Sequence, residues 1–178
     1  MVLSFCRYSM QYVVRCFPGS PFRKLRNALW RAVGFRVDST ANLMPTATLI
    51  CTDITIGPES FIGEEVMITG GKIVIGARCD LAPRVIVHAG SHEIGNSFRR
   101  AGNTYAGEIV ISDGCWIGTG AIILAGTRIG SGVLVAAGSV VQAGEYPDNS
   151  LLTGVPAQIK SRLDSAAKTD DPGYETSR

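Results

Sequence analysis

Aliphatic residues recur at every sixth position in the second half of this chain, and this period limits what the chain can fold into. An α-helix buries a residue about every 3.6 positions and a half-buried strand every second position, so neither explains a period of six. The positions after these aliphatic residues are often small. The aliphatic positions are Ile111, Ile117, Ile123, Ile129, Val135 and Val141.

A period of six fits a solenoid in which each hexad forms one short strand and one tight bend. The aliphatic side chain points inward, glycine permits positive φ at the bend, and stacked coils pair their backbones at about 4.8 Å. An earlier block repeats the pattern and contains one extra residue at the Gly70–Gly71 pair. Its core positions are Ile50, Ile56, Ile62, Ile68, Ile75, Leu81 and Val87. The sequence therefore predicts an all-β solenoid.

The composition describes an ordered globular protein, because 46% of the 178 residues are apolar and only 18% are charged. The five cysteines are scattered and lack CxxC spacing, so they indicate neither a disulfide framework nor a zinc knuckle. We therefore expect a reducing compartment and a cytoplasmic protein.

The first 37 residues carry seven basic residues and no acid, whereas the rest carry 10 basic and 15 acidic residues. The apolar runs are too short for a membrane span or a signal-peptide core. Phe22, Leu25, Leu29 and Val33 form one stripe of a predicted helix over residues 22–35. The stripe either packs on the main domain or forms a surface for an anionic partner, such as the inner face of a membrane.

The six-residue pattern is interrupted once, between Val87 and Ile111, which are four periods apart. The in-phase residues of this interval are not aliphatic; they are Glu93, Arg99 and Tyr105. We expect residues 93–108 to leave the coil as a polar loop, of the kind that carries function on a rigid scaffold.

His88 and His92 are the two histidines of the chain, and they lie next to this loop. Imidazole, with an unperturbed pKa of about 6.5, is suited to general base catalysis. A zinc pair is disfavoured, because a four-residue spacing in a strand that leads into a loop does not guarantee a common ligand geometry. Buried structural roles remain an alternative for both.

Three segments resemble the hexapeptide-repeat acyltransferases: LAPRVIVHAGSHEIG, CWIGTGAIILAGTRIG and VAAGSVVQAGEYPDNSLLTGVPAQI. The resemblance covers residues 45–160 and is strongest to the maltose and galactoside O-acetyltransferases and to their surface-polysaccharide relatives. It implies a left-handed parallel β-helix with three hexads per triangular coil. The hand comes from the resemblance alone, since parallel crossover connections are usually right-handed.

The resemblance implies that His92 is the general base that takes the proton of the acceptor hydroxyl, without a covalent enzyme intermediate. Glu93 either orients the His92 imidazole or faces solvent, and His88 is a groove residue or a structural one. Arg99 and Arg100 either contact the acceptor and anchor the loop or form a solvated turn. The family also implies a homotrimer, with the acceptor groove between subunits.

The resemblance further implies acetyl-CoA as acyl donor, with no metal required. Thr119 and Ala137 are three hexads apart, which is one coil, and match positions that line the pantetheine arm. Gly138 lies beside them, although a glycine at a corner needs no ligand to explain it. Trp116 matches an aromatic residue near the thioester, or serves packing only.

The phosphates of CoA are where the sequence departs from the family. Gln142–Ala143 stands where the family commonly has Thr-Lys, and Gln158 stands where it has a basic residue. Lys160 and Arg162, together with Arg128, remain candidates for the phosphates. Their alternative role is that of exposed surface charges.

The expected organisation is a basic helical segment (1–44), the β-helix (45–145) with its loop (93–108), a loop and short helix (146–165), and a disordered tail (166–178). The expected function is acetyl transfer to a hydroxyl of a sugar in a surface polysaccharide or glycan precursor, with no nucleic-acid partner. Acyl transfer to a nucleotide amino sugar or another small amine, and a non-catalytic trimeric scaffold, are the alternatives.

Overall fold

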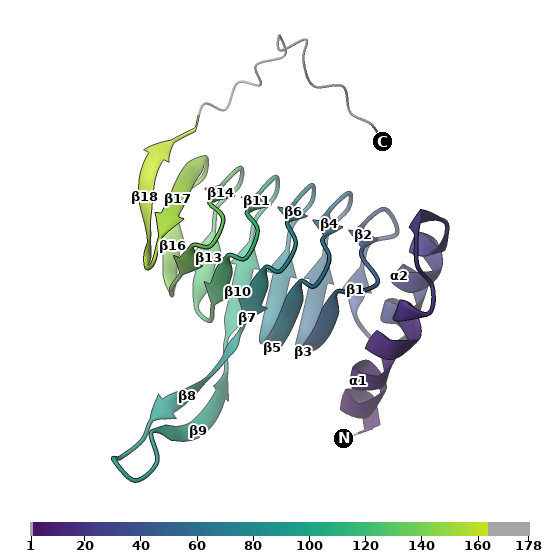
Figure 1. Cartoon of the computed structure of the whole chain (residues 1–178), viewed down its shortest axis with the longest axis horizontal. Coiled ribbons are helices and arrows are strands. Elements are labelled where there is room, and N and C mark those ends of the chain that lie inside the picture. The colour runs from purple at the N-terminus through teal and green to yellow at the C-terminus, as the bar shows by residue number, and fades with distance from the viewer. Residues whose placement is uncertain (1, 164–178) are drawn as a thin grey trace.

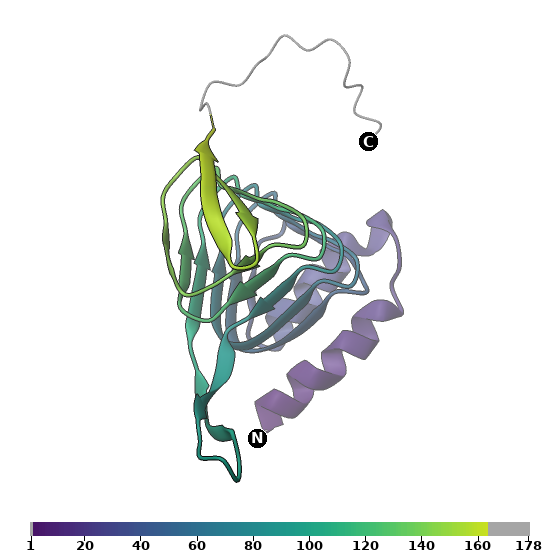
Figure 2. The same ribbon diagram turned by 60° about the vertical axis from the view of Figure 1, so that its left-hand side comes forward.

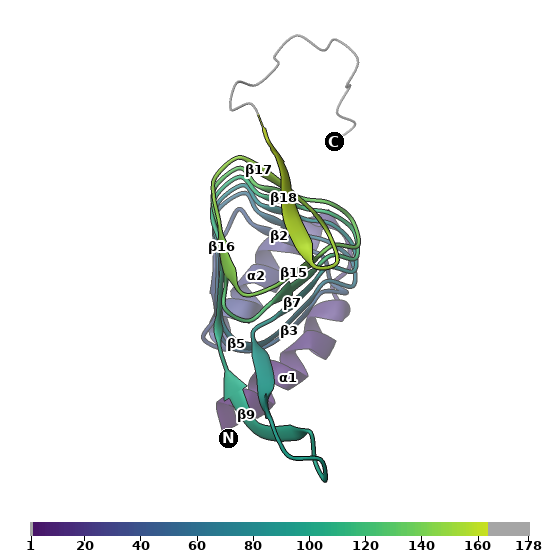
Figure 3. The same ribbon diagram turned by 90° about the vertical axis from the view of Figure 1, so that its left-hand side faces the viewer.

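Short parallel strands stack into a left-handed β-helix of about six turns (Figure 1). The structure is a computed structural model that describes residues 2–163, so the expected disordered tail (166–178) lies outside the described residues. Along its axis the β-helix has a roughly triangular outline, with both helices behind one end (Figure 3). The fold class predicted from the hexads is confirmed.

Each side of the triangle is a stack of strands, and one strand from every coil contributes to it. The first face contains β2 (Asn42–Leu43), β4 (Phe61–Ile62), β6 (Asp80–Leu81), β11 (Trp116–Ile117), β14 (Leu134–Val135) and β17 (Ser150–Gly154). The second face contains the first parts of β3 (Thr48–Ile56) and β5 (Met67–Ile75), then β7 (Ile86–His88), β12 (Ile122–Leu124) and β15 (Val140–Val141). The third contains β1 (Arg36–Val37), the ends of β3 and β5, β10 (Glu108–Ile111), β13 (Thr127–Ile129) and β16 (Gly144–Tyr146). The strands begin at Arg36, before the boundary expected at residue 45.

The predicted aliphatic column forms the core, with one exception at its beginning. The predicted aliphatic positions from Ile56 to Val141 are at most 1% exposed. Ile50, however, is 37% exposed, and its neighbour Leu49 is fully buried in its place. The cause is a second extra residue, in β3, which pairs with the one recognised at Gly70–Gly71 in β5. The prediction for Ile50 was therefore wrong by one position.

Coils before and after the interruption differ in length. Leu49 pairs with Ile68 one coil later, whereas Ile123 pairs with Val141 one coil later, so the earlier coil is longer by a single residue. The additional residue lies where β3 and β5 bend from the second face to the third. We call this edge of the triangle the hairpin corner, because the interruption leaves the coil there.

Two helices cover the N-terminal end of the β-helix: α1 (Val2–Arg15) and α2 (Arg23–Ala32), preceded by the 3-10 turn η1 (Ser20–Phe22) (Figure 1). The helix expected over residues 22–35 is present, but its inward face is different. Phe22 and Leu25 are each 42% exposed, whereas Arg26, Asn27 and Trp30 are buried. No helix within residues 2–163 is long and apolar enough to cross a membrane.

Backbone carbonyls explain why polar side chains of α2 turn inward. The first coil has no strand beneath it, so its open edge needs hydrogen-bond donors. Arg26 donates to the carbonyl oxygens of Leu43, Phe17 and Gly19 at 2.7–3.1 Å, and Asn27 donates to two more. Arg7, Arg23 and Arg31 also donate to backbone carbonyls. Much of the basic charge near the N-terminus thus caps the β-helix.

At the other end, the predicted short C-terminal helix is wrong. Residues Ala157–Arg162 form a strand, β18, which folds back antiparallel to β17. The last coil presents an unpaired strand edge, and β18 satisfies it with a ladder of hydrogen bonds that a helix could not supply. Gly154, with φ of 106°, and Pro156 turn the chain between the two strands.

Candidate active site

The interruption of the hexads is an antiparallel hairpin that projects from the middle of the β-helix (Figure 2). It consists of β8 (Gly90–Ile94) and β9 (Ala101–Ala106), whereas the sequence placed the loop at residues 93–108. The glycine pair of β5 allows the hairpin to leave the coil. A Cβ on Gly71 would lie 2.0 Å from the Gly107 carbonyl oxygen, and a Cβ on Gly70 would lie 2.5 Å from the Gly90 nitrogen. Only glycine lets the backbones approach this closely.

His92 lies on β8, in register with Thr104 of β9. Its Nδ1 is 3.0 Å from the carbonyl oxygen of Gly102. A carbonyl oxygen only accepts hydrogen bonds, so this bond requires the proton on Nδ1. The neutral ring then carries an unprotonated Nε2, which is the state that a general base needs.

His88 lies at the end of β7, on the second face, and its Nδ1 is 2.7 Å from the Oγ1 of Thr69. His88 and His92 line one cleft of about 380 Å³, together with Gly70, Tyr105 and other residues at the base of the hairpin. We call this the histidine cleft. The structure therefore brings the two predicted histidines together at the base of the hairpin.

Glu93 makes no hydrogen bond to the His92 imidazole, whose orientation was one of the two roles considered for it. Its carboxylate accepts a hydrogen bond from Asn103 Nδ2 at 3.2 Å, and the register of the hairpin shifts between His92 and Ile94. Such a bulge changes the direction of a side chain. The backbone of Gly102 orients His92 instead, a partner that sequence reasoning missed because it depends on how the two hairpin strands pair.

Arg99 and Arg100 lie at the tip of the hairpin, away from its base. Arg100 Nη1 donates to the Gly95 carbonyl oxygen at 3.3 Å, and the amide N–H of Arg99 donates to Asn96 Oδ1. Arg99 also lines a separate hollow at the tip, of about 450 Å³. Contact of these arginines with an acceptor stays a prediction.

Thr119, Ala137 and Gly138 lie together at another corner of the triangle, between the first and second faces. The N–H of Gly138 donates to the carbonyl oxygen of Thr119 at 2.9 Å, so the predicted one-coil relation holds. Gly120 and Gly138 both have φ of 69°, and a Cβ on either would meet no atom within 4 Å. The positive φ explains why these two positions are glycines. Because neither residue has a side chain, this edge of the β-helix is uncovered. We call it the glycine corner.

The same corner carries long side chains in the coils that precede the hairpin. Glu65 and Arg84 occupy the equivalent positions with φ of 56° and 62°, and Arg84 Nε lies 2.8 Å from a Glu65 carboxylate oxygen. The glycine corner therefore begins only after the hairpin. Trp116, on the adjoining first face, is 55% exposed, so it does not serve core packing alone.

The basic residues considered for the CoA phosphates are in different situations. Arg128 Nη2 binds the Glu108 carboxylate at 2.6 Å. Lys160 and Arg162 are exposed on β18, a strand rather than the helix expected there. Arg162 also donates to the carbonyl oxygen of Asp148.

Comparison with known proteins agrees with this architecture. The family model described as bacterial transferase hexapeptide (six repeats) matches residues 108–143. Galactoside O-acetyltransferase of Lactococcus lactis is 33% identical over 102 residues, which cover 57% of this chain and 49% of that protein. The chain spans about half the length of the curated relatives it matches.

Solved structures match over more of the chain. The crystal structure of a hexapeptide-repeat acetyltransferase from Vibrio cholerae is 30% identical, with a TM-score of 0.74 over 90% of this chain and 93% of that chain. Another structure of that protein contains acetyl-CoA; it is 30% identical, with a TM-score of 0.72 over 89% and 87%. A maltose O-acetyltransferase from Clostridium difficile is 25% identical, with a TM-score of 0.69 over 92% and 89%. The chain therefore belongs to the hexapeptide-repeat acetyltransferase family.

Proposed function

We propose that this protein is an acetyl-CoA-dependent O-acetyltransferase that acetylates a sugar hydroxyl, with His92 as the general base. The observation that carries the proposal is the hydrogen bond from His92 Nδ1 to the Gly102 carbonyl oxygen, which in the neutral ring leaves Nε2 free to accept a proton beside an open cleft. The sugar acceptor is suggested by the printed names of the galactoside and maltose relatives. A surface polysaccharide or a glycan precursor is the acceptor we expect.

The reaction needs one proton shuttle and no covalent enzyme intermediate. His92 Nε2 takes the proton of the acceptor hydroxyl while the hydroxyl oxygen attacks the thioester carbonyl carbon. The carbon–sulfur bond breaks, the CoA thiolate leaves, and the imidazolium returns the proton to it. Glu93 then acts on the hairpin through Asn103 rather than on the imidazole, and His88 contributes a wall of the acceptor cleft.

The glycine corner is the proposed donor site. Thr119 and Ala137 place equivalent backbone groups one coil apart along it, and the bare edge at Gly138 leaves room for a pantetheine arm. Trp116 would contact the thioester end. Lys160 and Arg162 at the end of the stack are the candidates for the phosphates.

The base and the proposed donor site of one chain lie at different corners, separated by the second face of the β-helix. A complete site therefore requires a second copy, which supports the predicted homotrimer with active sites between subunits. The hairpin also exposes two large apolar side chains, Ile94 at 91% and Phe98 at 98%. Burial of these side chains against a neighbouring copy would stabilise such an assembly.

Contact of the N-terminal segment with a membrane surface is a weaker part of the proposal, since four of its arginines serve the backbone. The support is a group of exposed aromatic side chains on α1, Phe5, Tyr8 and Tyr12, with the exposed Lys24 on α2. Co-sedimentation with vesicles of anionic and of neutral lipid tests it. Equal recovery with both would remove this part of the proposal.

The decisive experiment measures thiol release from acetyl-CoA with sugars, amino sugars and nucleotide amino sugars as acceptors. His92→Ala should lower kcat by about 10²–10⁴-fold, the usual contribution of a general base, with an unchanged KM for acetyl-CoA. Asn103→Ala serves as a control for disturbance of the hairpin, because it removes the partner of Glu93 without touching the imidazole.

Three outcomes would contradict the proposal in different ways. Full turnover by His92→Ala would exclude the base. Turnover with amines alone would favour the N-acyltransferase alternative. Absence of both turnover and acetyl-CoA binding would favour the scaffold.

A further inference from the structure

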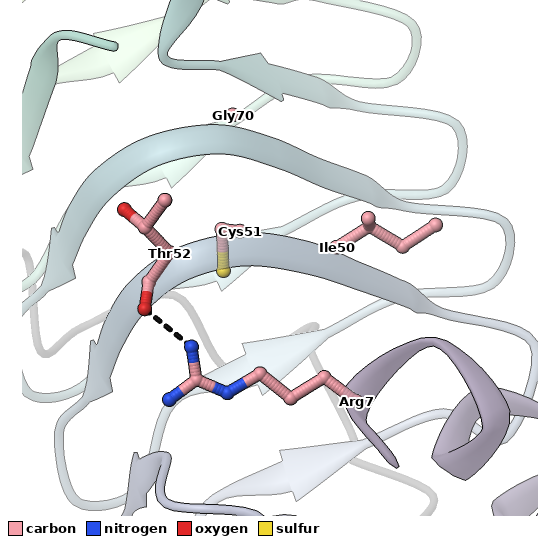
Figure 4. A pocket seen from close by; sticks show the side chains of 5 residues that line it. All are labelled: Arg7, Ile50, Cys51, Thr52 and Gly70. Carbon is pink, nitrogen blue, oxygen red and sulfur yellow. Dashed lines mark hydrogen bonds between the residues drawn. The ribbon is translucent and has the colours of Figure 1, made fainter. Parts of the chain in front are cut away.

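A second hollow adjoins the histidine cleft, on the side of the N-terminal helices. Figure 4 shows the residues that line this hollow. It has a volume of about 340 Å³ and is lined by Arg7 of α1 and by Ile50, Cys51, Thr52 and Gly70 of the hairpin corner. We call it the Arg7 hollow. Gly70 belongs to the walls of both cavities, so they are neighbours on the hairpin corner. Each is large enough for a sugar residue.

The guanidinium of Arg7 is held in place from three sides. Nε donates to the Val33 carbonyl oxygen at 3.0 Å, Nη1 donates to the Thr52 carbonyl oxygen, and Cζ lies 4.5 Å from the centre of the Phe35 ring. A guanidinium has five N–H donors, and these two bonds use two of them. Three donors remain for a ligand, in a side chain whose position is already fixed.

Arg7 also lacks a counter-charge. Arg36, from the same basic segment, is paired with Asp53 at 2.8 Å, but none of the ion pairs among residues 2–163 includes Arg7. A half-buried, preorganised arginine without a carboxylate partner is suited to bind an anion, since little rotamer entropy is lost.

The other walls suit the body of a sugar. Ile50 is 37% exposed and presents an apolar surface to the hollow, against which the C–H face of a pyranose ring can pack. Gly70 carries no side chain that would separate the hollow from the histidine cleft. The hexad pattern predicted Ile50 to be buried; its exposed side chain can instead contact a sugar ring.

We infer that the Arg7 hollow is an acceptor subsite that binds an anionic group, and that the enzyme selects acidic sugars over neutral ones. The inference rests on the proposed function, because it places the acceptor hydroxyl at His92 and the anion at Arg7. A carboxylate and a phosphate share this chemistry, since each can accept two parallel hydrogen bonds from a guanidinium.

Methyl galactoside, methyl galacturonide and methyl galactoside 6-phosphate differ only at C6 and form a matched set of probes. With acetyl-CoA, the wild type should show at least a tenfold lower KM for one of the two charged acceptors than for the neutral one. The charged probe that is preferred distinguishes a carboxylate from a phosphate. Arg7→Met should abolish this preference, and Arg7→Lys should restore part of it.

Arg15→Met is the matched control, since it removes the same charge from the same helix, at a residue that does not line the hollow. It should keep the preference. Equal KM values for the three probes in the wild type would overturn the inference, whether or not Arg7→Met folds. A preference that survives in Arg7→Met would overturn it as well.

Binding of the same probes without acetyl-CoA, followed by ligand-observed NMR, separates this inference from the proposed function. Preferential binding of a charged probe that depends on Arg7 would support the subsite even if no transfer occurred. Turnover of all three sugars without preference would leave the transferase standing and remove the subsite.

Discussion

The parts of the β-helix before and after the hairpin are built from the same hexads but differ at their corners. The coils before it bend over an extra residue at the hairpin corner, and they carry Glu65 and Arg84 at the next corner. The coil after it lacks the extra residue and has glycines at the corner that Glu65 and Arg84 occupy in the first part. The Arg7 hollow lies in the first part and the proposed donor edge in the second.

In our proposal this difference separates the acceptor site from the donor site along the β-helix. The extra residue before the hairpin lies at the corner where we place the acceptor, and the glycines after the hairpin leave an edge for the donor. The hairpin, with His92 on its first strand, stands at the boundary. The aliphatic core is continuous through both parts, so the difference is confined to the corners.

The largest expected effect tests the assignment of Leu49, and not Ile50, as the core residue of its coil. Leu49→Ala should lower the free energy of unfolding by about 2–5 kcal/mol, because it leaves a cavity in the core. Ile50→Ala should lower it by about 0.5 kcal/mol or less, as for a surface change. Denaturant unfolding measures both, with Ile123→Ala as the core control in the shorter coils. A larger loss of unfolding free energy for Ile50→Ala than for Leu49→Ala would show that this assignment is wrong.

The point where the hairpin leaves the coil should be sensitive to one added methyl group. Gly71→Ala places a Cβ against the Gly107 carbonyl oxygen, so we expect about 1–3 kcal/mol of destabilisation and faster amide exchange in β8 and β9. Gly114→Ala is the control, since its Cβ would have an atom no nearer than 3.9 Å and it lies at the corner between the third and first faces. It should leave exchange in the hairpin unchanged; equal exchange in both variants would contradict the role of the glycine pair.

A side chain introduced at the glycine corner should affect the donor alone. Gly138→Glu copies Glu65, which adopts a similar positive φ at the equivalent position, so the fold should tolerate it at a cost of about 1–2 kcal/mol. The KM for acetyl-CoA should rise at least tenfold. Gly114→Glu, with the same φ of 69° at a different corner, should leave this KM unchanged. An unaltered KM in Gly138→Glu would move the donor site elsewhere.

The smallest effect concerns an ion cluster that joins the two parts. Glu108 binds Lys72 of β5 at 2.8 Å and Arg128 of β13 at 2.6 Å. Lys72 first, and then Arg128, hold the pKa of the Glu108 carboxyl below its usual value. The stabilisation is therefore present above the unfolded-state pKa and is lost as the pH falls through the lowered one. The Tm difference between wild type and Glu108→Gln should be small at pH 7 and disappear in acid or high salt; a constant difference would contradict it.

Local patterns account for what could be predicted. The hexads predicted the core residues of most coils, because each short strand turns one aliphatic side chain inward and this depends only on the local sequence. The break in the period located the loop, and the resemblance to the hexapeptide-repeat acyltransferases pointed to His92 as a candidate base. Ile50 was misplaced because a single extra residue in β3 shifts the phase, and one neighbouring hexad is too little to detect it.

Other features depend on segments far apart in the chain. The inward Arg26 and Asn27 of α2 were missed because an amphipathic stripe predicts burial of apolar residues, whereas the open end of the β-helix required donors. The C-terminal helix was wrong because an unpaired strand edge favours another strand. The orienting carbonyl of Gly102 exists only after β8 and β9 have paired.

The sequence by itself determined the β-helix, its interruption and the candidate histidines, because a repeat of six encodes the coil locally and each coil contacts only its neighbours. Only the tertiary structure decided which atom orients His92, how both ends of the stack are covered, and that Arg7 and Gly70 share a cavity beside the histidine cleft. These depend on backbone groups and elements that meet across many residues, and a periodic pattern carries no information about them.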